Sequence, residues 1–368
     1  MSKSYLSLGL MSGTSADGVD ASIIQSDGDI EYEVILDKYF KYSQKIYENI
    51  HNLKVEINDI KDLKNLSKKI QILEKEITLF HANLVNEIIK KFNSNIDFVG
   101  FHGQTIFHNA REKISKQLGD GKLLSKLTKK NVIYNFRKND LKNGGQGAPL
   151  TPIFHKLLKE KFKIRDAVFV NIGGIVNITN ILNNGSMSGT DIGPGMCLID
   201  RWLREKLKKN YDKDGIIAQS GKVNKEALEQ LLKNFFKNEN NLSSESIQSF
   251  DTKYFNMSFV KNLSTEDGAA TLTEFTAQVI ILALKSEDRS DKEIILCGGG
   301  RKNIFLVSNL KKKIKNLKLI DEYGVDGDFV ESQAFAYLAV RSYLNLPISF
   351  PETTGVSKPT NGGILINY

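Results

Sequence analysis

The stretch Gly9-Leu10-Met11-Ser12-Gly13-Thr14-Ser15-Ala16-Asp17-Gly18-Val19-Asp20 decides the fold. Alternating apolar residues (Leu6, Leu8, Leu10) precede it and an apolar segment, residues 19–24, closes it, so the pattern predicts strand, tight turn and strand. Glycines let a backbone approach an anion, hydroxyl and N–H groups can hold that anion, and carboxylates can position a cation. A nucleoside triphosphate with Mg²⁺ requires these groups.

Two common nucleotide-binding motifs do not fit this turn. The P-loop needs a Lys after its second glycine, and the Rossmann fingerprint needs Gly-x-Gly-x-x-Gly at the start of a helix; the stretch has neither. The sequence therefore predicts a phosphate-binding hairpin of another kind.

Length and composition indicate a packed, two-domain protein. The chain has 368 residues, beyond the size that one hydrophobic core usually serves, with 40% apolar residues and 6 prolines. No apolar run approaches the roughly 18–20 residues that span a bilayer, and residues 1–4 begin no signal-peptide core. We expect a cytoplasmic protein with no membrane partner. Cys197 and Cys297 suit buried thiols better than a disulfide or a metal site.

The net charge of +8 raises the question of nucleic-acid binding. The lysines are spread along the chain among acidic residues, on segments that resemble polar helix faces, for example residues 156–163 and 311–315. A solvated surface explains them better than a binding patch does, so no nucleic-acid partner is expected.

The opening hairpin has a second copy about halfway along the chain. Residues 168–179, Val-Phe-Val-Asn-Ile-Gly-Gly-Ile-Val-Asn-Ile-Thr, again predict strand, glycine turn and strand. The repeat predicts two related α/β domains, residues 1–164 and 165–368, that face each other across a cleft where ligands bind. Whether the last long helix, from about Asp328, crosses back to the first domain is left open.

Five predicted turns combine glycines with polar side chains at strand ends: residues 11–18, 102–105, 143–149, 189–195 and 298–303. In α/β sheets, ligand sites gather at such loops, and a helix after Gly298-Gly299-Gly300 would present free N–H groups to a nucleotide. A single glycine loop is usually an ordinary turn, but five such loops in two similar halves favour a binding site.

These loops also carry a family resemblance. Residues 11–20 closely resemble the N-terminal signature of anhydro-N-acetylmuramic acid kinases, and further segments match the family in order: residues 102–105, 136–137, 144–150, 171–177, 191–195, 297–303 and 331–336. The resemblance covers nearly the whole chain.

The resemblance implies an actin/sugar kinase/Hsp70-like (ribonuclease H-like) fold with ATP and Mg²⁺ in an interdomain cleft. It implies that water opens the 1,6-anhydro ring of anhydro-N-acetylmuramic acid while the sugar O6 is phosphorylated. The product is N-acetylmuramic acid 6-phosphate, an intermediate of peptidoglycan recycling. The partners would be these small molecules, and a homodimer is left open.

The resemblance also assigns roles to residues. Asp191 is the expected general base, because it occupies the position of the family's catalytic aspartate. The nucleotide would be bound by Gly13, Thr14, Ser15, Ala16, Asp17, Gly18, Val19, Asp20, Gly173, Gly174, Gly298, Gly299, Gly300 and Asn303, with Asp17 and Asp20 holding Mg²⁺ through water. The sugar would be bound by His102, Gln104, Arg137, Gly145 and Glu331.

Structural roles compete with several of these assignments. Asp191 can cap a turn or helix, Asp20 can tie the hairpin, and Arg137 can form a surface ion pair. Asp328 and Glu331 have the spacing of a capping box. His102 and His108 lack a nearby third ligand, so we expect no metal there.

The chain departs from the family pattern at Ala16, where Leu is usual, at Ile192 in place of Thr, and at Met196 in place of Asn. The lost polar side chains bear on rate and sugar specificity. Two rival functions are considered beside the anhydrosugar kinase. One is a kinase of the same fold for another sugar or acid, and the other is a nucleotide-dependent binding or chaperone-like ATPase.

Overall fold

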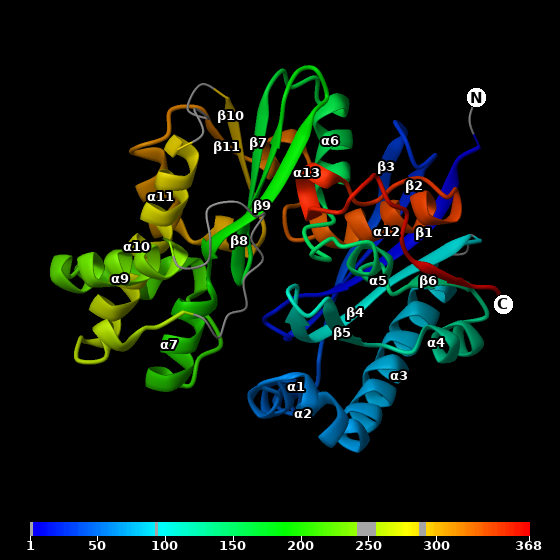
Figure 1. The fold of residues 1–368 in the computed structure, drawn as a ribbon, viewed down its shortest axis with the longest axis horizontal. Helices are drawn as coiled ribbons and strands as arrows, with labels where there is room; N and C mark the ends of the chain where they lie inside the picture. Colours follow the sequence, from blue (N-terminus) through cyan, green and yellow to red (C-terminus); the bar gives the residue numbers. More distant parts are fainter. Residues whose placement is uncertain (1–2, 93–94, 241–254, 287–291) are drawn as a thin grey trace. The chain divides into compact units, whose positions relative to one another are not determined.

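The computed structural model describes residues 3–92, 95–240, 255–286 and 292–368. They form two compact units (Figure 1): Met1–Lys161 with Phe329–Tyr368, and Phe162–Asp328. Each unit contains one β-sheet with its own helices. The chain from Phe329 onward groups with the first unit rather than with residues 165–328, since its long helix packs on the first sheet.

The first unit has a seven-stranded sheet in the order β12-β6-β4-β1-β2-β3, with β5 paired to β4. Its elements are β1 (Tyr5–Ser12), β2 (Gly18–Ser26), β3 (Tyr32–Lys41), α1 (Gln44–Glu56), α2 (Ile60–Asn65), α3 (Ser67–Phe92), β4 (Phe98–Asn109), β5 (Ile114–Leu118), α4 (Gly121–Thr128), β6 (Asn131–Tyr134), α5 (Lys138–Lys142), α6 (Pro152–Lys161), α12 (Val330–Tyr343), α13 (Pro351–Thr354) and β12 (Ile364–Ile366).

The second unit has a five-stranded sheet in the order β11-β10-β7-β8-β9. Its elements are β7 (Ala167–Ile172), β8 (Ile175–Ile181), β9 (Met187–Pro194), α7 (Cys197–Leu207), α8 (Ile216–Ser220), α9 (Lys225–Asn240), α10 (Thr265–Ser286), β10 (Glu293–Cys297), α11 (Ile304–Lys311) and β11 (Leu317–Leu319).

The two sheets share one topology. In each, three consecutive strands run antiparallel, β1-β2-β3 and β7-β8-β9. The next strand joins the first in parallel, β4 beside β1 and β10 beside β7, and β6 or β11 extends the parallel part. The repeated hairpin of the sequence thus opens two sheets with the same strand order. The predicted fold class, α/β with two related halves, is confirmed.

Two glycines bring α12 unusually close to the first sheet. Gly9 on β1 and Gly100 on β4 are register partners. A Cβ atom on Gly9 would collide with the Ser332 carbonyl oxygen, and one on Gly100 with the Phe335 carbonyl oxygen. In Figure 1 the orange α12 lies beside the blue β1 and β2, although these elements come from opposite ends of the chain.

The polar side chains of α12 that face the sheet are satisfied there. Ser332 and Gln333 are fully buried. The Ser332 hydroxyl lies 2.6 Å from the Ser22 hydroxyl, and the Gln333 amide donates to Asp37 Oδ2 at 2.8 Å. The Tyr32 hydroxyl donates to Gln333 Oε1 at 2.5 Å. Buried polar groups without partners are costly, so this network fixes how α12 sits on β2 and β3.

Helix α10 corrects one expectation from the sequence. By length and hydropathy, Thr265–Lys285 could cross a membrane, so the expectation that no such run exists is wrong on composition. In the structure 72% of this apolar window is buried inside the protein. Leu272, Phe275 and Val279 belong to an apolar cluster that also contains Trp202. Helix α10 is thus apolar on most sides because it is the core helix of the second unit.

We predict that Gly9→Ala destabilises the protein by about 2 kcal/mol or more, because the added methyl group meets helix backbone that has no rotamer through which to escape. Thermal or urea unfolding followed by circular dichroism measures this change. Gly13→Ala is the matched control. Its Cβ would lie 4.0 Å from the nearest neighbour, so the free energy of unfolding should change by less than about 0.5 kcal/mol. Equal effects of both substitutions would contradict the proposed close approach.

Candidate active site

The turn between β1 and β2 exposes backbone donors. The Gly13 carbonyl accepts from Gln104 Nε2 at 3.0 Å, and the Thr14 carbonyl accepts from Lys54 Nζ at 3.1 Å. A trans peptide points its C=O and the following N–H in opposite directions, so these contacts turn the N–H groups of Thr14 and Ser15 away from the protein. Neither N–H has an acceptor among the described residues. Such paired free donors suit an anion.

The base of this turn is braced across two strands. Ser12 and Gln104 are register partners at the ends of the β1–β4 pair. The Ser12 hydroxyl lies 2.6 Å from Gln104 Oε1 and 2.9 Å from the Gly18 carbonyl oxygen, both acceptors. Gln104 therefore accepts from Ser12 through its oxygen while its amide donates to Gly13. The structure places Gln104 in contact with the hairpin turn, whereas the family resemblance assigned it to sugar binding.

Helix α1 supplies two contacts that the sequence did not predict. Besides Lys54, the His51 ring donates from Nε2 to the Ser15 carbonyl oxygen at 3.0 Å, which defines Nε2 as the protonated nitrogen. The signal in the sequence is weak, because a His and a Lys three residues apart are common on helix surfaces. Only the return of α1 over the hairpin brings them to the turn.

Asp17 and Asp20 flank the same turn. The Ser15 hydroxyl donates to Asp17 Oδ1 at 2.5 Å, and Tyr42 N–H donates to the Asp17 carbonyl. Asp20 pairs in register with Met11 and Tyr39. The described residues contain no cluster of three His, Cys, Asp or Glu side chains that could hold a metal ion. Mg²⁺ usually keeps several waters and phosphate oxygens as ligands, so two carboxylates could hold it through water. Metal binding by Asp17 and Asp20 stays a prediction.

His102 and Arg137 form a second polar group in the first unit. The Arg137 guanidinium donates to His102 Nε2 from Nε at 3.2 Å and from Nη2 at 3.0 Å, and to the Gly147 carbonyl oxygen at 2.7 Å. His102 Nδ1 donates to the Gly103 carbonyl oxygen at 2.8 Å, so the ring is neutral. Burial, with Arg137 adding to it, lowers the pKa of His102 to about 3.

The neighbouring loop, residues 143–149, is anchored by Asp140, which sequence reasoning missed. Its buried carboxylate accepts from Gly147 N–H at 2.6 Å and from the Thr354 hydroxyl at 2.6 Å. A side chain on Gly145 would collide with this carboxylate. Gly145 therefore has a packing role that explains its residue type, and its contact with the sugar stays a prediction.

In the second unit, Asp191 belongs to a polar row across the sheet. Asn171 pairs in register with Asn177, and Asn177 pairs with Asp191 next to a β-bulge. Register partners point to the same face, so the three side chains line one face of the sheet. Asn177 Oδ1 is buried and has no hydrogen-bond partner among the described residues. An unsatisfied polar atom beside Asp191 marks this row as a place where a ligand or water completes the hydrogen bonding.

The Gly173-Gly174 turn receives the start of α7. The Gly174 carbonyl accepts from the N–H groups of Gly195 and Cys197, and the Gly173 carbonyl accepts from Met196 N–H at 2.9 Å. A side chain on Gly195 would collide with the Gly173 carbonyl oxygen. These two glycine turns are thus locked together, which holds the segment after Asp191 in place.

Two departures from the family pattern have apolar roles here. Ile192 is buried in the cluster of Val170, Ile178 and Leu296. Met196 is the N-cap residue of α7 without a side-chain cap, and it packs against both apolar clusters of the second unit.

The turn after β10 has one open and two crowded glycines. Side chains on Gly298 or Gly300 would collide with Asn171 or Ile172, whereas Gly299 faces free space. Asn303 is the N-cap of α11, where its Oδ1 accepts from Leu306 N–H at 2.9 Å. Its Nδ2 is buried and has no hydrogen-bond partner in the part of the chain that the structure describes. Asn303 therefore has a capping role, and nucleotide binding by this turn stays a prediction.

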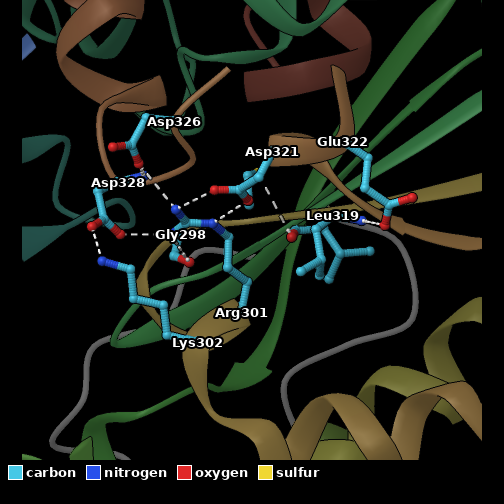
Figure 2. Close-up of polar contacts among 10 residues, drawn as sticks. Gly298, Arg301, Lys302, Leu319, Asp321, Glu322, Asp326 and Asp328 are labelled. Atoms are coloured by element: carbon cyan, nitrogen blue, oxygen red, sulfur yellow. Dashed lines mark hydrogen bonds and ion pairs between the residues drawn. The ribbon is translucent and has the colours of Figure 1, made fainter. Parts of the chain in front are cut away.

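Arg301, which the sequence did not single out as a site residue, organises this turn. Its side chain is 3% exposed and forms a two-bond pair with Asp321, at 2.7 and 2.8 Å. It also contacts Asp326 at 3.0 Å and Asp328 at 2.5 Å, and donates to the Gly298 carbonyl oxygen (Figure 2). Burial opposes its charge, yet the carboxylates raise the pKa of Arg301. Arg301 in turn lowers the pKa of Asp321.

The capping-box alternative for Glu331 is wrong. Helix α12 begins at Val330 with Phe329 as its N-cap, not Asp328. The Asp328 carboxylate instead pairs with Arg301 and Lys302, as Figure 2 shows. Asp328 does not cap the helix because both of its carboxylate oxygens are paired with cations of the second unit. Sugar binding by Glu331 stays a prediction.

The predicted residues thus fall into two sets. The first unit brings together the hairpin turn with Gln104, and separately His102 with Arg137 and the loop that contains Gly145. The second unit brings Asp191 into one sheet with the glycine turns at 173–174 and 298–300. Long-range partners that no local pattern could reveal complete both sets: Lys54, Asp140 and Arg301.

Comparison with known proteins identifies the family. A family model described as anhydro-N-acetylmuramic acid kinase matches residues 5–367. The anhydro-N-acetylmuramic acid kinase of Pelagibacter ubique is 55% identical over 100% of both chains, and that of Agrobacterium fabrum is 35% identical over 98% of both. This chain belongs to the anhydro-N-acetylmuramic acid kinase family.

Two solved structures show a distant likeness to this chain. A 2-hydroxyisocaproyl-CoA dehydratase activator from Clostridium difficile has a TM-score of 0.40 and 11% identity, covering 91% of this chain and 94% of its own. The (R)-2-hydroxyglutaryl-CoA dehydratase component A of Acidaminococcus fermentans has a TM-score of 0.45 and 11% identity, covering 92% and 99%. The assignment to the family rests on the sequence matches.

We predict that Arg301→Met lowers the free energy of unfolding of the second unit by about 2–4 kcal/mol, because three carboxylates lose their shared cation. Trp202, the single tryptophan of the chain, is buried in this unit and reports its unfolding in urea by fluorescence. Arg165→Met is the control. Its exposed pair with Asp166, at 3.7 Å, should contribute less than about 0.5 kcal/mol. If both variants behave alike, Arg301 does not organise the turn.

Proposed function

We propose that this chain is an ATP-dependent kinase that opens anhydro-N-acetylmuramic acid with water and phosphorylates it. The product is N-acetylmuramic acid 6-phosphate. The observation that carries the proposal is the family match over residues 5–367, a range that includes the candidate base Asp191 and all five glycine-containing segments. The free N–H groups of the hairpin and the polar row at Asp191 support it.

The chemistry divides into two bond exchanges. Asp191 takes a proton from water, the water oxygen bonds to the anomeric carbon, and the bond from that carbon to O6 breaks. O6 then bonds to the γ-phosphorus, and the bond to the bridging oxygen of ADP breaks. A proton leaves with the products. Asp191 suits the base because the neighbouring Asn177 and Asn171 on the same sheet face can orient a water.

ATP would bind through the hairpin turn and the Gly298–Gly300 turn. The backbone N–H groups of Thr14 and Ser15 would donate hydrogen bonds to phosphate oxygens. Gly299 leaves the space that a nucleotide needs. Mg²⁺, held through water by Asp17 and Asp20, would neutralise charge on the phosphates. Asp20 as a ligand and Asp20 as a tie of the hairpin remain alternatives.

The sugar would bind near Arg137. The guanidinium of Arg137 donates to the unprotonated Nε2 of His102, which is neutral. The positive charge of Arg137 is therefore not neutralised by His102. Arg137 can therefore pair with the lactyl carboxylate of the substrate, and His102 holds it in position. Glu331 would bind a sugar hydroxyl. A cytoplasmic location, the absence of nucleic-acid partners and a homodimer stay expectations from the sequence.

We predict that the protein releases ADP from ATP and Mg²⁺ only when anhydro-N-acetylmuramic acid is present, and that Asp191→Asn lowers kcat by about 10³-fold. Nucleotide affinity of the variant should stay within about threefold, because the carboxylate acts on water. Coupled ADP-release kinetics and nucleotide titration measure both. Asp166→Asn, a change of the same kind outside the site, is the control. Turnover of another sugar alone would support the rival kinase, and peptide-dependent ADP release would support the chaperone-like ATPase.

We predict further that Gln104→Leu raises the KM for ATP by about tenfold, because the Gly13 carbonyl loses its donor and the turn loses its fixed orientation. Steady-state kinetics with ATP varied at saturating sugar measures this effect. Gln117→Leu, on the neighbouring β5, removes a half-buried amide that contacts only Thr105 and Ser115, so it should leave this KM unchanged. An unchanged KM in Gln104→Leu would remove Gln104 from the turn's support and return it to the sugar site.

A further inference from the structure

A cavity lies in the first unit, and no residue of the hairpin turn lines it. Its volume is about 360 Å³, within the range of small-molecule sites. It lies between α5, the end of α12 and the strand β12, and it is lined by Ile133, Asn135, Lys138, Asn139, Lys142, Ser342, Asn345, Asn361, Gly362, Gly363, Ile364 and Leu365. None of these residues belongs to the proposed ATP or sugar site.

The cavity is positively charged. Lys138 and Lys142 are four residues apart on α5, so their side chains share one face of the helix. Neither forms an ion pair with any residue in the described part of the chain, and the lining contains no Asp or Glu. Two unpaired ammonium groups at one cavity favour a ligand with two negative charges.

Asparagine side chains form the polar wall. The Asn139 amide donates to the Asn361 carbonyl oxygen at 2.8 Å, and the Asn361 amide donates to Asn345 Oδ1. The amide groups of Asn135 and Asn345 have no acceptor among the described residues. Both of these residues have left-handed backbones, with φ of 57° and 59°. This arrangement leaves two amides available to hydroxyl groups of a ligand.

Two glycines allow the segment before β12 to pack closely on the residues beside the cavity. A side chain on Gly363 would meet Ile133 and Ser342, and one on Gly362 would meet Ile348. Ile364 and Leu365 are partly exposed beside them and supply an apolar edge. An apolar edge, free amides and two ammonium groups together match a sugar ring that carries a phosphate.

We propose that this cavity binds a small phosphomonoester, a phosphorylated sugar, at a site separate from catalysis. A phosphomonoester carries about −1.5 to −2 charges at pH 7, which matches Lys138 and Lys142 better than a single carboxylate does. The side-chain NH₂ groups of Asn135 and Asn345 donate hydrogen bonds to the hydroxyl oxygens of the sugar. Inorganic phosphate shares the charge but lacks the ring, so it binds the same lysines more weakly.

Helix α5 connects this cavity to the proposed sugar site. The residue before it, Arg137, contacts His102, and Asp140 on its other side holds the loop at Gly147. A ligand that fixes Lys138 and Lys142 therefore restrains the helix that positions Arg137. This coupling, which rests on the proposed function, predicts that the phosphomonoester changes the KM for the anhydrosugar by at least about twofold.

Binding is tested by calorimetry with glucose 6-phosphate and with inorganic phosphate, on the full chain saturated with ADP and Mg²⁺ so that the nucleotide site is filled. Lys138→Gln/Lys142→Gln should weaken binding of glucose 6-phosphate at least tenfold. Lys122→Gln/Lys126→Gln is the matched control, since these exposed lysines have the same spacing on α4 of the same unit. Its affinity should equal that of the unchanged chain.

Each result decides between outcomes. Equal loss in both double variants would show a general charge effect and overturn the site, as would binding that Lys138→Gln/Lys142→Gln leaves intact. Phosphate binding as tightly as glucose 6-phosphate would overturn the sugar part of the proposal. The calorimetric arm needs no turnover, so it stands or falls independently of the proposed kinase activity. A KM that responds to glucose 6-phosphate in the unchanged chain, but not in Lys138→Gln/Lys142→Gln, supports the coupling; an unresponsive KM overturns it.

Discussion

The close approach of α12 to β1 and β4 constrains the whole first unit. Gly9 and Gly100 lie side by side in the sheet, and the helix backbone occupies the space that their side chains would need. The pairing of the same two strands ends, a few residues later, at Ser12 and Gln104, which hold the hairpin turn. Because the helix fixes the two strands against each other, it also fixes the ends that carry the site. The packing of small residues thus determines the geometry of a distant polar turn.

The sequence predicted the features that depend on local order. Alternating apolar residues around residues 9–20 and 168–179 were sufficient to predict both hairpins, and their similarity predicted two related halves. The glycine turns after β1 and β10 lie where the pattern placed them. The other three predictions are wrong, because residues 102–105 lie inside β4, residues 189–194 lie inside β9, and the loop at 143–149 follows α5 rather than a strand. Asp191 lies inside β9 rather than in the predicted turn, and its role still depends on the family.

The remaining features depend on contacts that a linear pattern does not contain. Arg301 meets Asp321, Asp326 and Asp328 only after the intervening helix and strand have folded back. Lys54 and His51 reach the hairpin because α1 returns over it. Asp328 and Glu331 have the spacing of a cap, but Asp328 pairs with Arg301 and the helix begins with Phe329 as its N-cap. Local rules fail here because tertiary ion pairs and buried polar networks outweigh propensity.

The discontinuity of the first unit has a consequence for biosynthesis. The second unit, Phe162–Asp328, is one continuous segment, so all its strands and helices are available before α12 has been translated. The first unit begins earlier but lacks α12 until then, and the flat strip at Gly9 and Gly100 stays uncovered. The order of completion on the ribosome is therefore the reverse of the order of synthesis, with the unit that starts first finishing last. During that interval α12 does not yet cover the glycine strip or the hydroxyl of Ser22 on the nascent sheet. This uncovered sheet is the part of the chain most in need of protection from aggregation.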